Sequence, residues 1–316
     1  MVFLEVITFI FGIHIYMSWL DLSLILPFFS SAFSLSSKVL LKDVQPTSYT
    51  AYVLLLSGLM IVAYNLLTGK KIKLNAWAVI SGFAFGLATF GFETAVSKAK
   101  NPGMVNAVYR TQTALTAILS VFLLGSHLSP LSITGIIIAL LGAVTIALDH
   151  KSIEHFTGDE IKENKYNYEW IKWAIGAGVL LTVKDITAVK SLRSGMTPYS
   201  YAMAQLLFGA LIMFGYKYYK EHSLKLNLDK SANVWGTLSG MGFVATDNVL
   251  WCLLLVYLMG KAPNPAYPKA ITLISVVLTA FLSKFFFPEA ALDFQQWAGI
   301  FMVLGGIGTM VFANVI

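Results

Sequence analysis

Charged residues are scarce in this chain, and cysteine is nearly absent. Only 12% of the 316 residues are Asp, Glu, Lys or Arg, whereas 57% are hydrophobic and the mean hydropathy is +0.72. This balance excludes an ordinary soluble domain and predicts an integral membrane protein. The single cysteine, Cys252, excludes a disulfide within the chain and a cysteine metal cluster.

Motifs for enzyme chemistry are also missing. The sequence contains no GxxxxGK[ST], HExxH or GxSxG pattern, and its five histidines are scattered. We therefore expect no enzyme, no catalytic residues, no cofactor and no metal. The net charge of +6 comes largely from lysines in short connections such as 70–73, which is typical of membrane-flanking charge and not of nucleic-acid binding.

Long apolar stretches make up most of the remaining chain. Each is roughly 20 residues long, enough for a helix to cross a bilayer. The pattern predicts an all-α fold with about ten transmembrane helices, placed near 20–41, 47–68, 76–98, 102–124, 131–149, 170–192, 198–219, 233–259, 265–287 and 294–315.

The second half of the chain repeats the first. At an offset of 152 residues, identical pairs are Lys38 and Lys190, Leu40 and Leu192, Pro46 and Pro198, Ser48 and Ser200, and Tyr49 and Tyr201. The offset then grows, and at 163 residues it pairs 98–102 with 261–265. Every match keeps the same order, which predicts a duplication. Because five helices per copy reverse the direction of the second copy, we expect two inverted repeats.

The predicted organisation has four parts. Residues 1–18 form an apolar extension, either an interfacial helix or an extra span, and 20–149 form the first five-helix repeat. The polar stretch 150–169 is a linker, and 170–316 form the second repeat.

These features resemble the drug/metabolite transporter superfamily in its EamA-like form. The resemblance rests on Pro46–Tyr49 and Pro198–Tyr201, and on Pro288-Glu289, Gln296, Gly299 and Gly305-Gly306 near the end. It implies ten spans, alternating access, and both termini in the cytoplasm. The distribution of lysine and arginine between the loops favours the opposite orientation.

The clearest candidate site residue is Arg110. If a helix begins near Pro102, eight residues at 1.5 Å each place Arg110 about 12 Å deep, close to the membrane midplane. Asn106 and Tyr109 share its helix face. A guanidinium suits a carboxylate or phosphate of a substrate. The alternative is a structural salt bridge to Glu93 or Asp247.

Five other ionisable candidates lie inside predicted spans, where charge is costly without a partner. Lys269 follows Pro268 in the repeat equivalent of the Arg110 helix, where it either contacts substrate or reaches the headgroups. Glu93 and Asp247 are candidates for a coupling proton or for counter-ions. Lys184 and Asp185 are sequence neighbours that point about 100° apart, so their partners must lie elsewhere.

Together these features predict a secondary active transporter. It would move a small polar or amphipathic organic metabolite, with an anionic group as one option, across a cell or organelle membrane. The candidate substrate-binding residues are Arg110, Lys269, Asn106, Tyr109, Asp247, Trp251 and Glu93. The partners are the bilayer, a small-molecule substrate and a candidate coupling proton, with no nucleic acid. Alternatives are a transport-inactive scaffold or receptor and a membrane-embedded lipid-modifying enzyme.

Overall fold

The computed structural model describes residues 18–99, 101–147, 169–230, 232–287 and 294–315. The described part is helical, and its β-structure is limited to one isolated bridge between Val44 and Leu228. Most of the predicted extension 1–18 and linker 150–169 lies outside the described residues. In chain order the helices are α2 (Trp19–Ser23), α3 (Leu26–Leu40), α4 (Pro46–Leu67), α5 (Ala76–Lys98), α6 (Pro102–Arg110), α7 (Gln112–Leu124), α8 (Pro130–Ala147), α10 (Glu169–Arg193), α11 (Pro198–Glu221), α12 (Val234–Lys261), α13 (Ala266–Ile271), α14 (Ile274–Phe286) and α15 (Phe294–Val315).

Among the described residues, seven helical segments are long and apolar enough to cross a membrane. They are Trp19–Leu40, Pro46–Leu67, Ala76–Lys98, Pro102–Leu124, Pro198–Glu221, Val234–Lys261 and Ala266–Phe286. Shorter apolar stretches lie within α8 and α15, and α10 is long but carries charged residues. The prediction of an all-α membrane protein is confirmed, whereas the count of ten spans and the repeat layout stay predictions.

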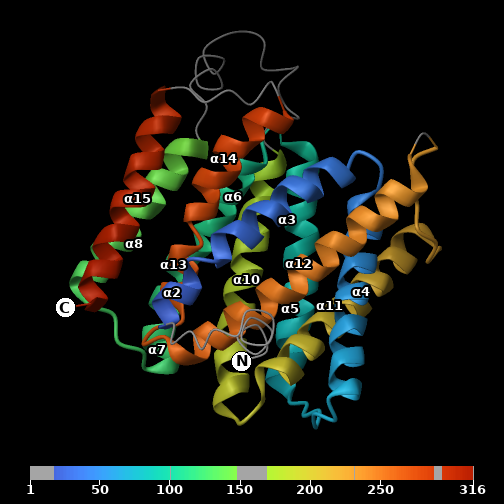
Figure 1. Cartoon of the computed structure of the whole chain (residues 1–316), viewed down its shortest axis with the longest axis horizontal. Coiled ribbons are helices and arrows are strands. Elements are labelled where there is room, and N and C mark those ends of the chain that lie inside the picture. Colours follow the sequence, from blue (N-terminus) through green and yellow to red (C-terminus); the bar gives the residue numbers. More distant parts are fainter. Residues whose placement is uncertain (1–17, 100, 148–168, 231, 288–293, 316) are drawn as a thin grey trace, which may run out of the picture.

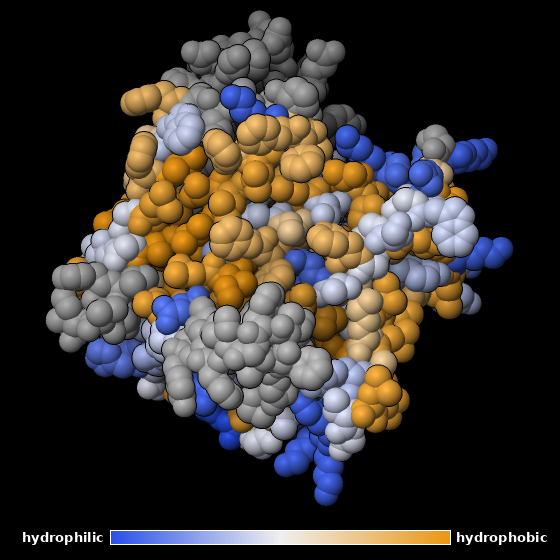
Figure 2. All heavy atoms as spheres, in the orientation of Figure 1, coloured by the Kyte–Doolittle hydropathy of each residue, from blue (hydrophilic) through white to orange (hydrophobic). Residues whose placement is uncertain are grey.

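The outer surface is strongly apolar. Orange, hydrophobic residues cover much of the face seen in Figure 2, and large side chains such as Phe122, Phe285 and Phe301 are more than two-thirds exposed. In water such a surface would drive aggregation, but in a bilayer the lipid tails cover it. The surface therefore fits the membrane location predicted from composition.

Three of the predicted spans are interrupted, a feature that the sequence prediction lacked. Helix α6 ends at Arg110, and the Thr111 N–H donates to the Val108 carbonyl three residues back, at 3.1 Å. Between α13 and α14, Leu273 donates in the same way to Ala270, at 2.9 Å. These tighter turns shift the helix axis. Between α2 and α3 the turn lies just before Pro27, which has no N–H to donate.

The helices pack closely where glycines meet. A Cβ on Gly86 of α5 would lie 2.5 Å from the Gly209 carbonyl oxygen of α11, and a Cβ on Gly142 of α8 would lie 2.6 Å from that of Gly299 on α15. Such backbone contact needs residues without a side chain. In Figure 1, α8 and α15 run side by side at one flank, and α4 packs with α11 at the other. Helices α3, α5, α10 and α12 lie between these two pairs.

Candidate functional site

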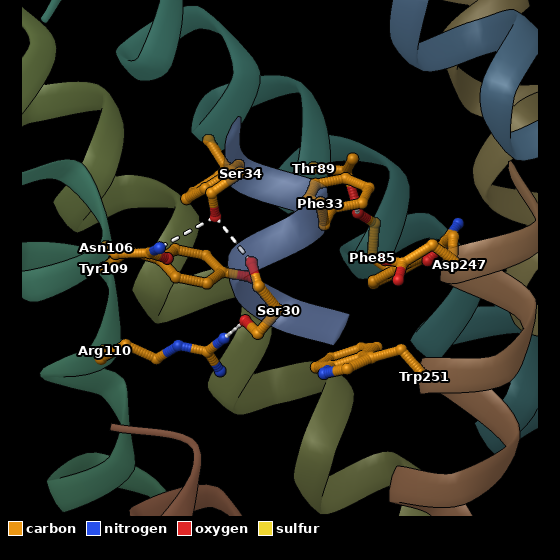
Figure 3. A pocket seen from close by; sticks show the side chains of 12 residues that line it. Ser30, Phe33, Ser34, Phe85, Thr89, Asn106, Tyr109, Arg110, Asp247 and Trp251 are labelled. Carbon is orange, nitrogen blue, oxygen red and sulfur yellow. Dashed lines mark hydrogen bonds between the residues drawn. The ribbon is translucent and has the colours of Figure 1, made fainter. Parts of the chain in front are cut away.

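A cavity opens between α3, α5, α6 and α12 (Figure 3). Three of these helices come from the predicted first repeat and α12 comes from the second. The cavity is lined by Ser30, Phe33, Ser34, Phe85, Thr89, Phe92, Asn106, Tyr109, Arg110, Asp247, Asn248 and Trp251. Five of the seven predicted site residues are therefore in the lining, and Lys269 and Glu93 are not.

Arg110 brings a buried positive charge to the cavity wall. Its side chain is 2% exposed, and Nη1 donates to the Thr272 hydroxyl at 2.9 Å. Nη2 donates to the Ser30 hydroxyl, and Nε has no hydrogen-bond partner. Within the described chain no carboxylate lies within 4.0 Å of Arg110, so the alternative of a salt bridge to Glu93 or Asp247 is not realised.

The two interrupted spans explain how Arg110 is held. Arg110 is the last residue of α6, and its partner Thr272 lies between α13 and α14. The Thr272 hydroxyl in turn donates to the Lys269 carbonyl at 2.6 Å. The guanidinium therefore joins both helix breaks. Non-helical backbone at membrane depth is expected only where it lines a cavity or is buried in protein.

Asn106 and Tyr109 position α6 against its neighbours. The Asn106 amide donates to the Ser34 hydroxyl at 2.8 Å and to the Thr279 hydroxyl at 3.1 Å. The Tyr109 ring lies 4.8 Å from the Phe92 ring, centroid to centroid. Asn106 thus links α6 to α3 and α14, while Tyr109 supplies an aromatic wall beside Arg110.

Asp247 and Trp251 form the opposite wall, one turn apart on α12 (Figure 3). Both are buried, with Asp247 6% and Trp251 9% exposed. Asp247 Oδ2 and the Trp251 indole N–H have no hydrogen-bond partner in the described structure. The cavity therefore presents unused polar atoms on both sides: Nε of Arg110 on one, and Oδ2 and Nε1 on the other.

Glu93 belongs to a hydrogen-bonded group of side chains outside the cavity lining. It is fully buried on α5, and its Oε1 accepts a hydrogen bond from the Ser37 hydroxyl at 3.1 Å. Ser37 also shares a hydrogen bond of 2.8 Å with the Tyr49 hydroxyl. These three side chains join α3, α4 and α5, and Glu93 has no cationic partner among the described residues.

Lys269 lies in a buried charge cluster with Lys184 and Asp185. The ammonium groups of both lysines are 3.2 Å from the same atom, Asp185 Oδ1. They also lie 5.1 and 5.5 Å from the centre of the Trp251 ring, for Lys269 and Lys184 respectively. Trp251 therefore contacts these lysines and the cavity. Lys184 pairs with its sequence neighbour Asp185, so the prediction that its partner lies elsewhere is wrong. For Asp185 the prediction holds in part, because Lys269 on another helix is its second partner.

Sequence reasoning missed much of the lining. Ser30 and Ser34 are four residues apart and share a face of α3, so the helical spacing of hydroxyls was a usable signal. The sequence did not indicate Phe33, Phe85 and Phe92, because a phenylalanine in an apolar span is equally consistent with a side chain that faces lipid and with one that lines a cavity. No group of three or more potential metal ligands occurs among the described residues.

Comparisons with known proteins bear on the first half and on the fold. Residues 17–148 match the model of the EamA-like transporter family. A crystal structure described only as that of a protein shares the fold, with a TM-score of 0.66 and 16% identity over 92% of this chain and 98% of that one. No curated protein matched the chain. Residues 17–148 of this multi-pass membrane protein are thus similar to the EamA-like transporter family, which is part of the drug/metabolite transporter superfamily.

Proposed function

We propose that the chain is a secondary carrier that moves a small amphipathic organic anion by alternating access. The observation that carries this proposal is Arg110, a buried cation on the cavity wall with one unused donor and, among the described residues, no carboxylate within 4.0 Å. A guanidinium keeps its charge, so an unbalanced one in a membrane is costly unless an anion joins it. A substrate carboxylate or phosphate would supply that charge.

The rest of the lining suits an apolar substrate body. Phe33, Phe85, Phe92, Tyr109 and Trp251 surround the space beside Arg110. Aromatic walls bury apolar surface and leave a few polar atoms to fix orientation. An anion with a flat or aliphatic body therefore fits better than a fully polar one.

Two inverted repeats would provide the conformational change. We propose that 20–149 and 170–316 are these repeats and exchange access by rocking about the cavity. In support, Asn101 and Asn264, paired by the repeat alignment, precede equivalent helices and make the same contact: each side-chain oxygen accepts a backbone N–H two residues later, at 2.7 and 2.8 Å. Both helices are also interrupted, after Arg110 and after Ile271.

The test uses probes that differ in one group. We expect 4-ethylbenzoate to raise the melting temperature of the purified protein, because a ligand at 100 times its Kd stabilises the folded state by about 2.7 kcal/mol. The neutral analogue 4-ethylbenzamide should have little effect. Equal effects of both probes, or none, would contradict an anion site. Accumulation of labelled 4-ethylbenzoate in proteoliposomes then distinguishes a carrier from a binding-only receptor.

A second candidate substrate is a zwitterion, and Asp247 is the observation that favours it. Its unused Oδ2 faces the cavity from the wall opposite Arg110, so a ligand with a cationic end could bind both walls. The probe 4-(aminomethyl)benzoate replaces the terminal methyl of 4-ethylbenzoate with an ammonium. If zwitterions are preferred, it should bind more tightly than 4-ethylbenzoate, and Asp247→Asn should abolish that preference and leave 4-ethylbenzoate binding unchanged. A preference that survives in Asp247→Asn rules out this role.

A further inference from the structure

The buried cluster behind Trp251 contains more positive than negative charge. Lys184, Asp185 and Lys269 are each 0% exposed, and the Thr116 hydroxyl lies 3.4 Å from Asp185 Oδ2. With both lysines protonated, the three side chains would carry a net charge of +1. In the described part of the chain neither lysine has another carboxylate within 4.0 Å.

Such an excess is unfavourable in a membrane interior. Two ammonium groups that share one carboxylate oxygen are close neighbours, and each disfavours the charge of the other. The Trp251 ring offsets part of this cost, since both ammoniums lie near it. The remaining charge can be removed by a bound anion or by the loss of one proton. The described cavity has neither lysine in its lining, which favours loss of a proton.

The hydrogen-bond geometry indicates which lysine is the less firmly held. Lys184 Nζ donates a hydrogen bond to Asp185 Oδ1, at 3.2 Å. Lys269 Nζ lies at the same distance from that atom but makes no hydrogen bond of acceptable geometry. A hydrogen bond to the charged form stabilises the charge. Lys269 is therefore the lysine that gives up a proton at lower cost.

We propose that Lys269 binds the proton that this carrier couples to its anionic substrate, neutral when the cavity is empty and protonated when an anion is bound. The link between protonation of Lys269 and binding of an anionic substrate rests on the proposed function. Binding would take up one anion and one proton, so the bound complex gains no net charge. The proton goes to Lys269 Nζ, which lies 3.2 Å from Asp185 Oδ1.

Arg110 provides the link between the two events. Its guanidinium donates to Thr272, whose hydroxyl donates to the backbone carbonyl of Lys269. In the empty cavity the Arg110 charge repels a second charge on Lys269, and a bound anion cancels that repulsion. Because coupling between two ligands is reciprocal, the proton must strengthen anion binding as much as the anion strengthens proton binding.

The surroundings of Lys269 contain few other groups that could take this role. Helix α7 (Gln112–Leu124) and the described α15 carry no ionisable residue, and Asp21 of α2 is bonded to Ser18. The buried charged or titratable side chains of the nearby helices are Lys184 and Asp185 on α10, Tyr109 and Arg110 on α6, Asp247 and Cys252 on α12, and Tyr267 on α13. Asp247 and the more distant Glu93 are the competing proton sites.

The first measurement needs no substrate. Nitrogen-15 NMR of lysine-labelled protein follows each amine through a pH titration, and Lys269→Arg and Lys184→Arg assign the two signals by their loss. We expect the Lys269 signal to change from ammonium to amine within the pH range in which the protein stays folded. A Lys269 signal that keeps the ammonium shift throughout overturns the proposal.

The second measurement tests coupling with 4-ethylbenzoate. Calorimetry in buffers of different ionisation enthalpy gives the number of protons taken up per bound anion. We expect about one in the wild type, with Kd rising about tenfold per pH unit in the range where Lys269 is neutral. In Lys269→Arg, which cannot lose its charge, uptake and pH dependence should vanish. Lys269→Met gives a second variant without the exchangeable proton.

Matched controls separate the competing sites. Asp247→Asn and Glu93→Gln should keep an uptake of about one proton, and loss of uptake in either variant assigns the proton to that acid and overturns the proposal. Proton uptake that persists in Lys269→Arg also overturns the proposal. If 4-ethylbenzoate fails to bind the wild type, the proposed substrate class fails, while the NMR titration still decides whether Lys269 exchanges a proton.

Discussion

Asp185→Asn is expected to destabilise the protein by about 3–5 kcal/mol, the cost of breaking a buried ion pair and leaving its charges uncompensated. The substitution keeps the size of the side chain but removes the only carboxylate that lies near Lys184 and Lys269 in the described structure. The buried ammonium of Lys184 would then lie beside the Lys269 amine without a counter-charge. The expected readout is a clear fall in melting temperature and in the yield of folded protein.

Lys269→Met is the matched control for that substitution. It removes the Lys269 amine, which is neutral in the empty cavity, and leaves Lys184 with Asp185 as a balanced pair, joined by the hydrogen bond already present. No buried charge loses its partner, and the new apolar side chain is of similar length. The melting temperature should therefore stay near that of the wild type. If both variants melt alike, the cluster is not a set of charges balanced on Asp185.

The sequence predicted the helical framework because its signals are local. Apolar length marked the spans, and prolines such as Pro46, Pro102 and Pro198 mark the observed starts of α4, α6 and α11. The interruptions after Arg110 and Ile271 were not predicted. Neither has a glycine or proline at the break itself, and the two breaks are joined by the hydrogen bond between Arg110 and Thr272.

The site was predictable only in part, for a related reason. Arg110 and Asp247 stood out because charge inside a span demands an explanation, and both line the cavity. Lys269 and Glu93 gave the same signal, yet their partners are Asp185 and Ser37. Which buried charge faces a cavity and which faces a partner depends on packing between distant helices, which a single sequence does not encode locally.

Arg110→Lys is expected to weaken 4-ethylbenzoate binding well over tenfold. The change keeps the positive charge but loses the planar fork of donors that matches a carboxylate. Losing a charge-assisted contact in a site without water costs roughly 2–5 kcal/mol of binding free energy. Converted to a dissociation constant, this loss raises the Kd of 4-ethylbenzoate by well over tenfold. Arg193→Lys is the matched control, because Arg193 donates to the Leu124 carbonyl at 2.6 Å and is not part of the cavity lining.

The stability of Arg110→Ala separates a binding role from a structural one. A structural salt bridge would leave an unpaired acid after the substitution, but in the described structure Arg110 is bonded only to the hydroxyls of Ser30 and Thr272. Those hydroxyls lose a partner and no carboxylate is left unpaired, so the melting temperature should fall far less than in Asp185→Asn. Binding of 4-ethylbenzoate should nevertheless be lost. Normal affinity in Arg110→Lys, together with a large loss of stability in Arg110→Ala, would show that Arg110 holds the helices together and does not bind substrate.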